Sequence, residues 1–219
     1  MRPEKPKWTR LLMIDSQAVK NTCNAANCGG VLQPQYCLAS VESKGFCHYK
    51  CTNGIKRHLA VDTLGLPFFT HCTKANVTDD QGLIEIANVP GGILRAGQFA
   101  LSHHLDYFRA KPVNIPRVTI LLDHGYHSDL LTTALQALYP QVMTKLRFQL
   151  APKPTKAEKA AQGKTGFVPV ATRWIIERSN AWMERCKSLV KNFERTLSHA
   201  TAKINLCFIR LMLKRLAHS

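Results

Sequence analysis

The chain has 219 residues, about one and a half times a common domain length, which favours one elaborated domain over two independent ones. With 45% hydrophobic and 20% charged residues, the composition excludes a wholly disordered chain, and no apolar run reaches the length of a membrane span. Thirty Lys and Arg residues against fourteen Asp and Glu residues leave a formal charge of +16. This charge favours a polyanionic partner, with nucleic acid ahead of an anionic membrane surface.

The eight cysteines raise the question of disulfides or a metal site. The apolar run that follows the basic N-terminus, residues 11–14, is too short for the core of a signal peptide, so we expect an intracellular chain with free thiols. Five cysteines lie close together without a C-x2-C pair or histidines at matching spacing, namely Cys23, Cys28, Cys37, Cys47 and Cys51. We therefore disfavour structural zinc.

The first half of the chain alternates β-rich runs with polar segments. The patterns predict, in order, a buried strand at 9–14, an irregular connection at 21–54, a hairpin formed by 55–63 and 67–74, and a helix at 79–88. The polar run 76–80 supplies the capping signal for that helix. A sheet is therefore expected to begin close to the N-terminus.

The second half predicts further strands and helices around one basic segment. In order, it holds a helical candidate at 98–109, a strand at 118–122, a helix at 128–138, a strand at 142–146, a basic loop at 145–164, an amphipathic helix at 173–195 and a last helix at 201–217. The loop has six Lys and Arg residues against one Glu, so we favour phosphate contact over a merely solubilising role. Strands interleaved with helices predict an α/β fold with a mixed sheet flanked by helices.

Three of the acidic residues directly follow apolar strand runs. Asp15 follows LLMI, Asp62 follows LAV and Asp123 follows TILL. In α/β sheets the carboxyl ends of strands face the ligand crevice, so Asp15 and Asp123 are site candidates if their strands are adjacent and parallel. Asp62 precedes Thr-Leu-Gly and is better explained as a turn residue that hydrogen-bonds its own backbone.

Glu177 is a fourth candidate because it follows the apolar run 174–176 on a predicted helix. The simpler interpretation is an i,i+4 ion pair with Arg173. The alternative places Glu177 opposite Asp15 and Asp123, where three crowded carboxylates would repel one another unless divalent cations neutralise them. Two such ions can clamp the attacking and leaving oxygens of a phosphodiester, so an acidic centre in a basic chain indicates a metal-dependent nucleic-acid enzyme.

Four motifs resemble, in the same order, those of bacterial insertion-sequence transposases of the DDE type, in the insertion-sequence four/five superfamily. They are DSQAVK at 15–20, GIKRHLAVDTLG at 54–65, DHGY at 123–126 and RWIIER at 173–178. The spacing is similar too, since Asp123 follows Asp15 by 108 positions and Glu177 follows Asp123 by 54. The resemblance covers essentially the whole chain.

The resemblance implies an α/β, ribonuclease-H-like mixed β-sheet flanked by helices, with long inserted loops. It also implies that Asp15, Asp123 and Glu177 are the catalytic triad and bind two Mg²⁺ ions, for which Mn²⁺ would substitute. We expect a single catalytic domain over 1–219, made up of a sheet core with insertions at 9–146, a basic loop at 147–170, and C-terminal helices that carry the catalytic Glu at 171–219.

The helix motif of this family is often written Y-x2-R-x3-E-x6-K. Arg173 and Glu177 match it, whereas Val170 stands at the Tyr position and Glu184 at the Lys position. Other basic side chains would then have to replace the missing contacts with the DNA backbone. The expected DNA-binding residues are Lys20, Lys56, Arg57, His58, His124, Lys153, Lys156, Lys159, Lys164, Arg173, Arg178, Arg185 and Lys187.

Some of these residues have simpler explanations. Lys56 and His58 are equally well explained as polar side chains on the outer side of a strand. His124 lies in a strand-to-helix loop, where polar residues are usually just solvated. Trp174 and Trp182 are eight positions apart on a helix, which favours packing in the core over stacking on bases.

The expected activity is hydrolysis of a DNA phosphodiester by metal-activated water, followed by attack of the freed 3′-hydroxyl on target DNA. The alternatives are a structure-specific nuclease on the same fold and a catalytically inactive DNA-binding remnant. Expected partners are element ends, the target duplex, a second copy when bound to DNA, and an upstream DNA-binding segment in cis or in trans, because only fourteen residues precede Asp15. We expect a cytoplasmic, nucleoid-associated protein without membrane contact.

Overall fold

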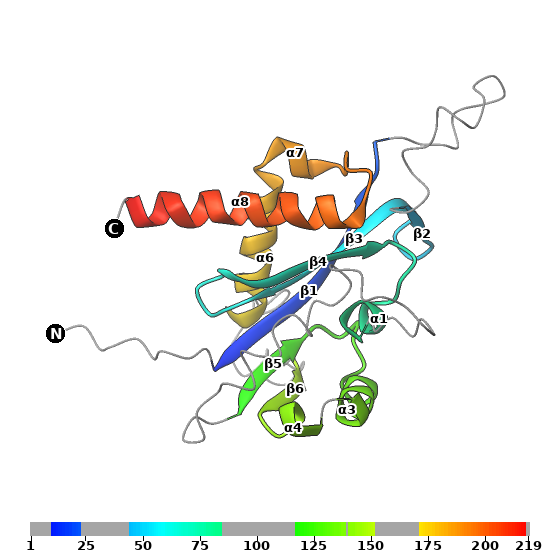
Figure 1. Ribbon diagram of the computed structural model, residues 1–219, viewed down its shortest axis with the longest axis vertical. Helices are drawn as coiled ribbons and strands as arrows, with labels where there is room; N and C mark the ends of the chain where they lie inside the picture. Colours follow the sequence, from blue (N-terminus) through cyan, green and yellow to red (C-terminus); the bar gives the residue numbers. More distant parts are fainter. Residues whose placement is uncertain (1–9, 23–43, 85–116, 139, 152–170, 218–219) are drawn as a thin grey trace, which may run out of the picture.

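The computed structural model describes residues 10–22, 44–84, 117–138, 140–151 and 171–217, which form a six-stranded mixed sheet with helices on its two faces (Figure 1). The strands are β1 (Leu11–Lys20), β2 (Gly45–Cys47), β3 (Thr52–Val61), β4 (Pro67–Lys74), β5 (Val118–Leu122) and β6 (Leu146–Leu150). The helices are α1 (Asp79–Ile84), α3 (Ser128–Leu138), α4 (Pro140–Met143), α6 (Ala171–Glu184), α7 (Lys187–Val190) and α8 (Leu197–Ala217).

The order of the strands combines an antiparallel part with a parallel part. The sheet runs β2-β3-β1-β5-β6, and β4 also pairs with β3. Strand β3 is antiparallel to β1, β2 and β4, whereas β5 is parallel to both β1 and β6. This mixed sheet between helices is consistent with a ribonuclease-H-like fold, so the predicted fold class is confirmed.

Each face of the sheet is covered by its own hydrophobic core, because successive side chains of a strand point to opposite faces. Leu12 and Ile14 of β1 pack with residues of α1, α3 and α4. Met13 and Val19 of the same strand pack on the other face with residues of α6, α7 and α8. The central strand β1 is thereby held between two helical layers.

Several predicted elements agree with the structure. Strands β4 and β5 and helix α3 have the predicted bounds, and α1 begins at the predicted residue. Asp62 is confirmed as a turn residue, because its Oδ1 atom accepts hydrogen bonds from the backbone N–H groups of Leu64 and Leu66, both at 2.9 Å. The same turn uses Gly65 at a φ of +76°, a conformation that favours glycine. The predicted helix 98–109 lies outside the described residues.

The predicted end of the first strand is wrong. Strand β1 continues through Asp15 to Lys20, because residues 16–20 remain paired with β3. Asp15 therefore lies inside β1, opposite Leu59 of β3, and directly follows the segment 11–14 that pairs with β5. The apolar run ends at Ile14, but backbone pairing with a neighbouring strand does not require apolar side chains.

Three predictions for the chain after β5 are also wrong. Residues 140–143 form helix α4 and not a strand, since Pro140 suits the first turn of a helix and a short apolar run does not distinguish the two structures. Strand β6 then takes up 146–150, the first part of the predicted basic loop, whose residues from 152 onward lie outside the described ones.

The predicted helix 173–195 is two helices, α6 and α7, because the chain turns at Cys186, whose N–H bonds to the Met183 carbonyl.

Gly82 allows α1 to lie directly against β3, and we predict that Gly82→Ala destabilises the protein. A Cβ atom at residue 82 would overlap the ring of His58, which is fully buried. The overlap outweighs the gain of about 1 kcal/mol in helix propensity, so the free energy of unfolding in urea should fall by about 1–2 kcal/mol. Gln136→Ala on the exposed side of α3 is the control and should change it by less than about 0.5 kcal/mol. An unchanged stability of Gly82→Ala would mean that α1 can move away from β3.

Candidate active site

Asp15 and Asp123 lie on neighbouring parallel strands. In the register of β1 and β5, Ile14 is opposite Leu122, and each of these residues is followed by an aspartate. The two carboxylates are therefore placed side by side by backbone hydrogen bonding, and not by a flexible loop. The expectation that their strands are adjacent and parallel is confirmed.

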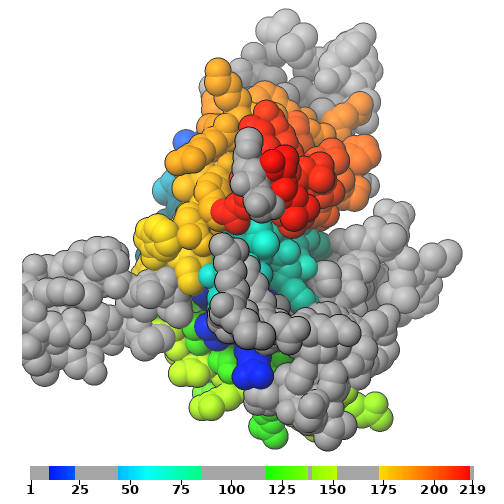
Figure 2. All heavy atoms as spheres, turned by 90° about the vertical axis from the view of Figure 1, so that its left-hand side faces the viewer, coloured from blue at the N-terminus to red at the C-terminus, as the bar shows by residue number. Residues whose placement is uncertain are grey.

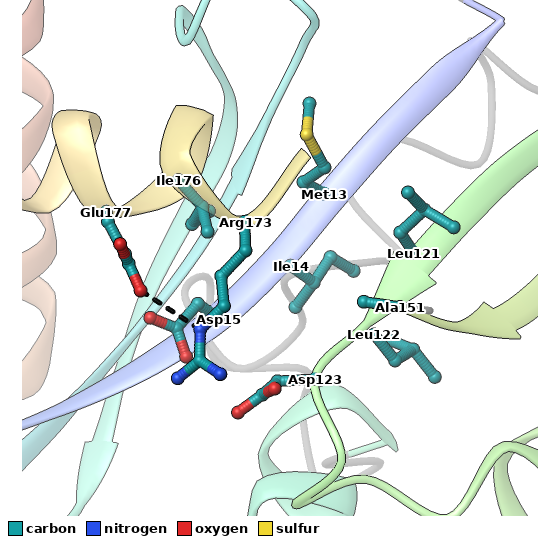
Figure 3. A pocket seen from close by; sticks show the side chains of 10 residues that line it. All are labelled: Met13, Ile14, Asp15, Leu121, Leu122, Asp123, Ala151, Arg173, Ile176 and Glu177. Atoms are coloured by element: carbon teal, nitrogen blue, oxygen red, sulfur yellow. Dashed lines mark hydrogen bonds and ion pairs between the residues drawn. The ribbon is translucent and has the colours of Figure 1, made fainter. Parts of the chain in front are cut away.

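Glu177 reaches the same place from helix α6. An open pocket of about 410 Å³ is lined by Asp15, Asp123 and Glu177, together with Arg173, Ala151 and apolar side chains of β1, β5 and α6 (Figure 3). Ile176, the residue before Glu177, is buried in the core between α6 and the sheet. Packing of Ile176 fixes the turn of α6 that presents Glu177, so two strands and one helix bring three carboxylates to a single pocket.

The Asp15 carboxylate is held by two hydrogen bonds in a poorly solvated position. Its Oδ1 accepts the backbone N–H of Ser16 at 2.8 Å, and its Oδ2 accepts the Asn180 side-chain amide at 2.9 Å. Burial raises the pKa of Asp15, and the negative charge of Asp123 adds to this effect, while the bonds from Ser16 and Asn180 offset part of it. The surroundings of Asp15 therefore disfavour its ionised form, although two hydrogen bonds fix the position of the carboxylate.

Glu177 also makes the simpler interaction that the sequence suggested. The Nε atom of Arg173 donates to Oε1 of Glu177 at 3.0 Å, and both side chains are about half exposed, 46% and 49%. An ion pair this exposed contributes at most about 1 kcal/mol. The two interpretations of Glu177 are therefore compatible, because the ion pair lies at the mouth of the carboxylate pocket (Figure 3).

Two acids at the start of α1 support the site from the other face of the sheet. Asp80 accepts the backbone N–H of His127 at 2.9 Å and lies 2.7 Å from its ring Nδ1, which ties down the loop that follows Asp123. Asp79 accepts the Ser16 hydroxyl at 2.7 Å and pairs with Lys56 at 2.8 Å. The sequence suggested only a helix cap here, so these supporting roles were missed, as was that of Asn180.

The chain matches the sequence model of the transposase DDE domain over residues 9–213. It belongs to this family. The matched range contains Asp15, Asp123 and Glu177 and extends from β1 into α8. The membership predicted from four short motifs is therefore confirmed.

Comparison with curated proteins gives a distant relative of the chain. The chain is 26% identical over 158 residues to a protein of Burkholderia cepacia named as a candidate transposase for insertion sequence element IS402. The alignment covers 71% of this chain and 62% of the relative, so the chain spans less than two thirds of the relative's length. No solved structure matches the chain. In the part of the chain that is described, no helix has the length and apolar character needed to cross a membrane.

Three of the expected DNA contacts of this DDE domain are buried, which corrects that prediction. Lys56, Arg57 and His58 of β3 are 7%, 4% and 0% exposed. Burial, with the neighbouring His71, lowers the pKa of His58 to about 3, so its ring is neutral. Arg57 donates to the Leu189 carbonyl at 2.7 Å, and Lys56 is paired with Asp79. These side chains contact neighbouring strands and helices, and little of their surface is open to solvent.

The remaining expected DNA contacts fall into two groups. Lys20, Arg173, Arg185 and Lys187 are exposed, and His124 is partly exposed beside Asp123, with its Nδ1 atom 3.9 Å from Oδ1. Arg178 differs, because its guanidinium stacks between Trp174 and Trp182 at 4.7 and 4.9 Å and donates to the Leu64 carbonyl. Four further lysines lie outside the described residues, namely Lys153, Lys156, Lys159 and Lys164.

The predicted packing of the two tryptophans holds only in part. Trp182 packs against the core between the sheet and α6, α7 and α8. Trp174 is 52% exposed, so its assignment to the core is wrong. Its ring instead covers Arg178, which anchors the turn between β3 and β4 to α6. Cation–π stacking therefore accounts for a tryptophan that the helical spacing assigned to the core.

The carboxylates of the DDE domain can be tested for their fit to divalent cations. Among the described residues, no three His, Cys, Asp or Glu side chains converge on one metal-binding point. Asp15 and Asp123 nevertheless share one pocket, and the charge of Asp123 raises the pKa of Asp15. Paired oxygen ligands that repel one another suit a hard cation. Glu177 lines the same pocket, but Arg173 holds its carboxylate.

The environment of Asp15 yields a prediction in the absence of metal ions. Asp123→Asn removes a neighbouring negative charge and should lower the pKa of Asp15, whereas Asn180→Ala removes a hydrogen-bond donor and should raise it. Titration of the Asp15 carboxyl carbon by NMR measures both shifts. Shifts in the same direction, or none in either variant, would show that the contacts described do not control this carboxylate.

Proposed function

We propose that this chain is the catalytic domain of a DNA transposase that cleaves a phosphodiester at an element end and joins the freed 3′-hydroxyl to target DNA. The observation that carries the proposal is the placement of Asp15 and Asp123 by paired parallel strands in one pocket with Glu177. Membership of the transposase DDE domain family and the charge of +16 support it. No observation favours a nuclease that cuts without joining, or an inactive remnant.

We further propose that the pocket holds two Mg²⁺ ions, which Mn²⁺ can replace. Asp15 and Asp123 would share the ions, and Glu177 would complete one of the two sites. When bound, the ions would activate the attacking oxygen and stabilise the leaving oxygen. Burial and repulsion make Asp15 costly to ionise in the free chain, which is the situation that cation binding relieves.

The chain's own residues have distinct tasks in this scheme. Asn180 and the backbone of Ser16 hold both oxygens of Asp15 in fixed directions. Asp80 holds the loop after Asp123 through His127. Arg173 stands at the mouth of the pocket, where its guanidinium can meet a DNA phosphate in place of Glu177. The reacting phosphodiester is thus positioned by side chains that are themselves fixed.

The exposed basic residues suggest how DNA reaches the pocket. Arg173 lies on α6, Arg185 directly follows it and Lys187 begins α7, so a DNA backbone could follow this helix from the pocket toward α8. Lys20 stands at the far end of β1. Such contacts fix a DNA backbone but do not read its sequence directly. We therefore propose that end recognition needs another DNA-binding segment, in cis or in trans, and that two copies act together on DNA.

The triad predicts a common loss of metal-dependent activity. Asp15→Asn, Asp123→Asn and Glu177→Gln should each abolish Mg²⁺-dependent DNA cleavage while DNA affinity stays similar or rises, because each removes negative charge and no basic contact. Asp129→Asn, on the exposed side of α3, is the matched control and should stay active. Cleavage at the wild-type rate by any triad variant would exclude that residue from the site. Joining of a pre-cut 3′-hydroxyl end to plasmid DNA separates a transposase from a nuclease.

The basic loop predicts a change in salt dependence. If Lys153, Lys156, Lys159 and Lys164 each neutralise one phosphate, replacing all four with Ala should reduce the slope of log K against log salt by roughly 3–4 on duplex DNA. Fluorescence anisotropy at several salt concentrations measures this slope. The matched control is Lys214→Ala near the C-terminus, which should reduce the slope by roughly 1 or less. An unchanged slope in the fourfold variant would show that the loop is only solvated.

A further inference from the structure

Helix α8 has two apolar faces, and one of them packs in the core of the described part of the protein. Ala200, Ile204 and Phe208 are buried against the sheet and α6, and Leu211 packs beside them. None of the residues 209–217 is buried, and in Figure 1 this half of α8 projects past α6. Figure 2 shows the same end of the helix at the surface beside α6. A helical segment as short as 209–217 gains little stability from its own hydrogen bonds, so its stability depends on packing of its apolar side chains.

The second face is a narrow stripe of large aliphatic side chains. Leu206, Ile209 and Leu213 are 65%, 46% and 61% exposed, at the i, i+3, i+7 spacing of a helix-pairing seam, and Leu216, 71% exposed, continues this stripe. At about 100° per residue, the stripe lies nearly opposite the face that contains Ile204 and Phe208. None of these side chains lines the carboxylate pocket. The stripe is therefore separate from the proposed catalytic site.

One flank of the stripe is strongly basic. Arg210 and Lys214 of α8 and Arg185, which directly follows α6, line a second pocket of about 730 Å³, together with Trp182, Phe208 and other apolar residues. None of the residues that line it is acidic, and α8 contains no Asp or Glu in its 21 residues. Lys203, two turns before Arg210, is already paired with Glu194 at 2.6 Å. The stripe thus lies next to cations that α8 itself cannot neutralise.

We propose that this stripe docks an amphipathic helix of another polypeptide, with apolar residues at heptad spacing and Asp or Glu residues on the flank that meets Arg210 and Lys214. Aliphatic side chains gain free energy by burial against apolar groups, which DNA phosphates do not offer. A second α8 would bring no carboxylate to the cations. The stripe spans about 80° of the helix, which is also narrower than the broad apolar face with which helices lie on membranes.

The test uses a labelled acidic peptide of about three heptads, with Leu at the two core positions and Glu on the flanks. The comparison peptide has the same composition in scrambled order, so that it keeps the charge and loses the apolar face. In fluorescence anisotropy with the full chain, the amphipathic peptide should bind at least roughly tenfold more tightly than the scrambled one. Ile209→Ser with Leu213→Ser, and separately Arg210→Glu with Lys214→Glu, should each remove most of this preference.

Two controls keep the outcome specific. Leu130→Ser changes an equally exposed leucine on α3 and should bind like the wild type, and circular dichroism confirms that each variant is folded. Asp15→Asn should also bind the peptide normally, so failure here is distinct from failure of the proposed catalytic site. Equal binding of both peptides would overturn the proposal. So would a wild-type dimer that Ile209→Ser with Leu213→Ser dissociates, or stripe-dependent binding to vesicles of anionic phospholipid.

Discussion

The parallel pairing of β1 with β5 determines the rest of the site, because it puts Ile14 opposite Leu122 and so sets Asp15 beside Asp123. Backbone hydrogen bonds and a buried core on each face of β1 keep this register. The arrangement has an electrostatic cost, since burial and the charge of Asp123 both raise the pKa of Asp15. A fold that keeps two carboxylates in such a position suits a cation that makes both of them favourable.

The two helical layers hold this pair from opposite sides of the sheet. Helix α6 supplies Glu177 to the pocket and, one turn later, Asn180 to the carboxylate of Asp15. Helix α1 on the other face binds the Ser16 hydroxyl through Asp79 and the loop after Asp123 through Asp80. The buried Lys56 of β3 forms an ion pair with Asp79 at the start of α1. Fold stability and site geometry therefore depend on the same contacts, while the exposed stripe of α8 lies apart from them.

The acids that follow apolar runs, the hairpin turn and the family could be predicted because each depends on a local pattern in the sequence. Asp62, for example, is followed by the Thr-Leu-Gly that a turn requires. The supporting contacts could not be predicted, because they join residues far apart in the sequence. Asp79 and Ser16 are 63 positions apart, and Asn180 and Asp15 are 165 positions apart. Lys56 and His58 were misassigned for a related reason. Their charge or polarity indicates an outer face, but α1 covers that part of β3, where Lys56 pairs with Asp79 and the His58 Nε2 atom is hydrogen-bonded to the Thr73 hydroxyl.

The central claim is that Asp15 and Asp123 together form a site for a divalent cation. Anomalous diffraction from crystals soaked in Mn²⁺ tests it most directly, because the signal locates the ion independently of any activity. The account predicts an anomalous peak in contact with carboxylate oxygens of both Asp15 and Asp123, and the loss of this peak in crystals of Asp123→Asn. Anomalous peaks at other acidic residues, with none at Asp15 and Asp123 in the same crystals, would contradict the account.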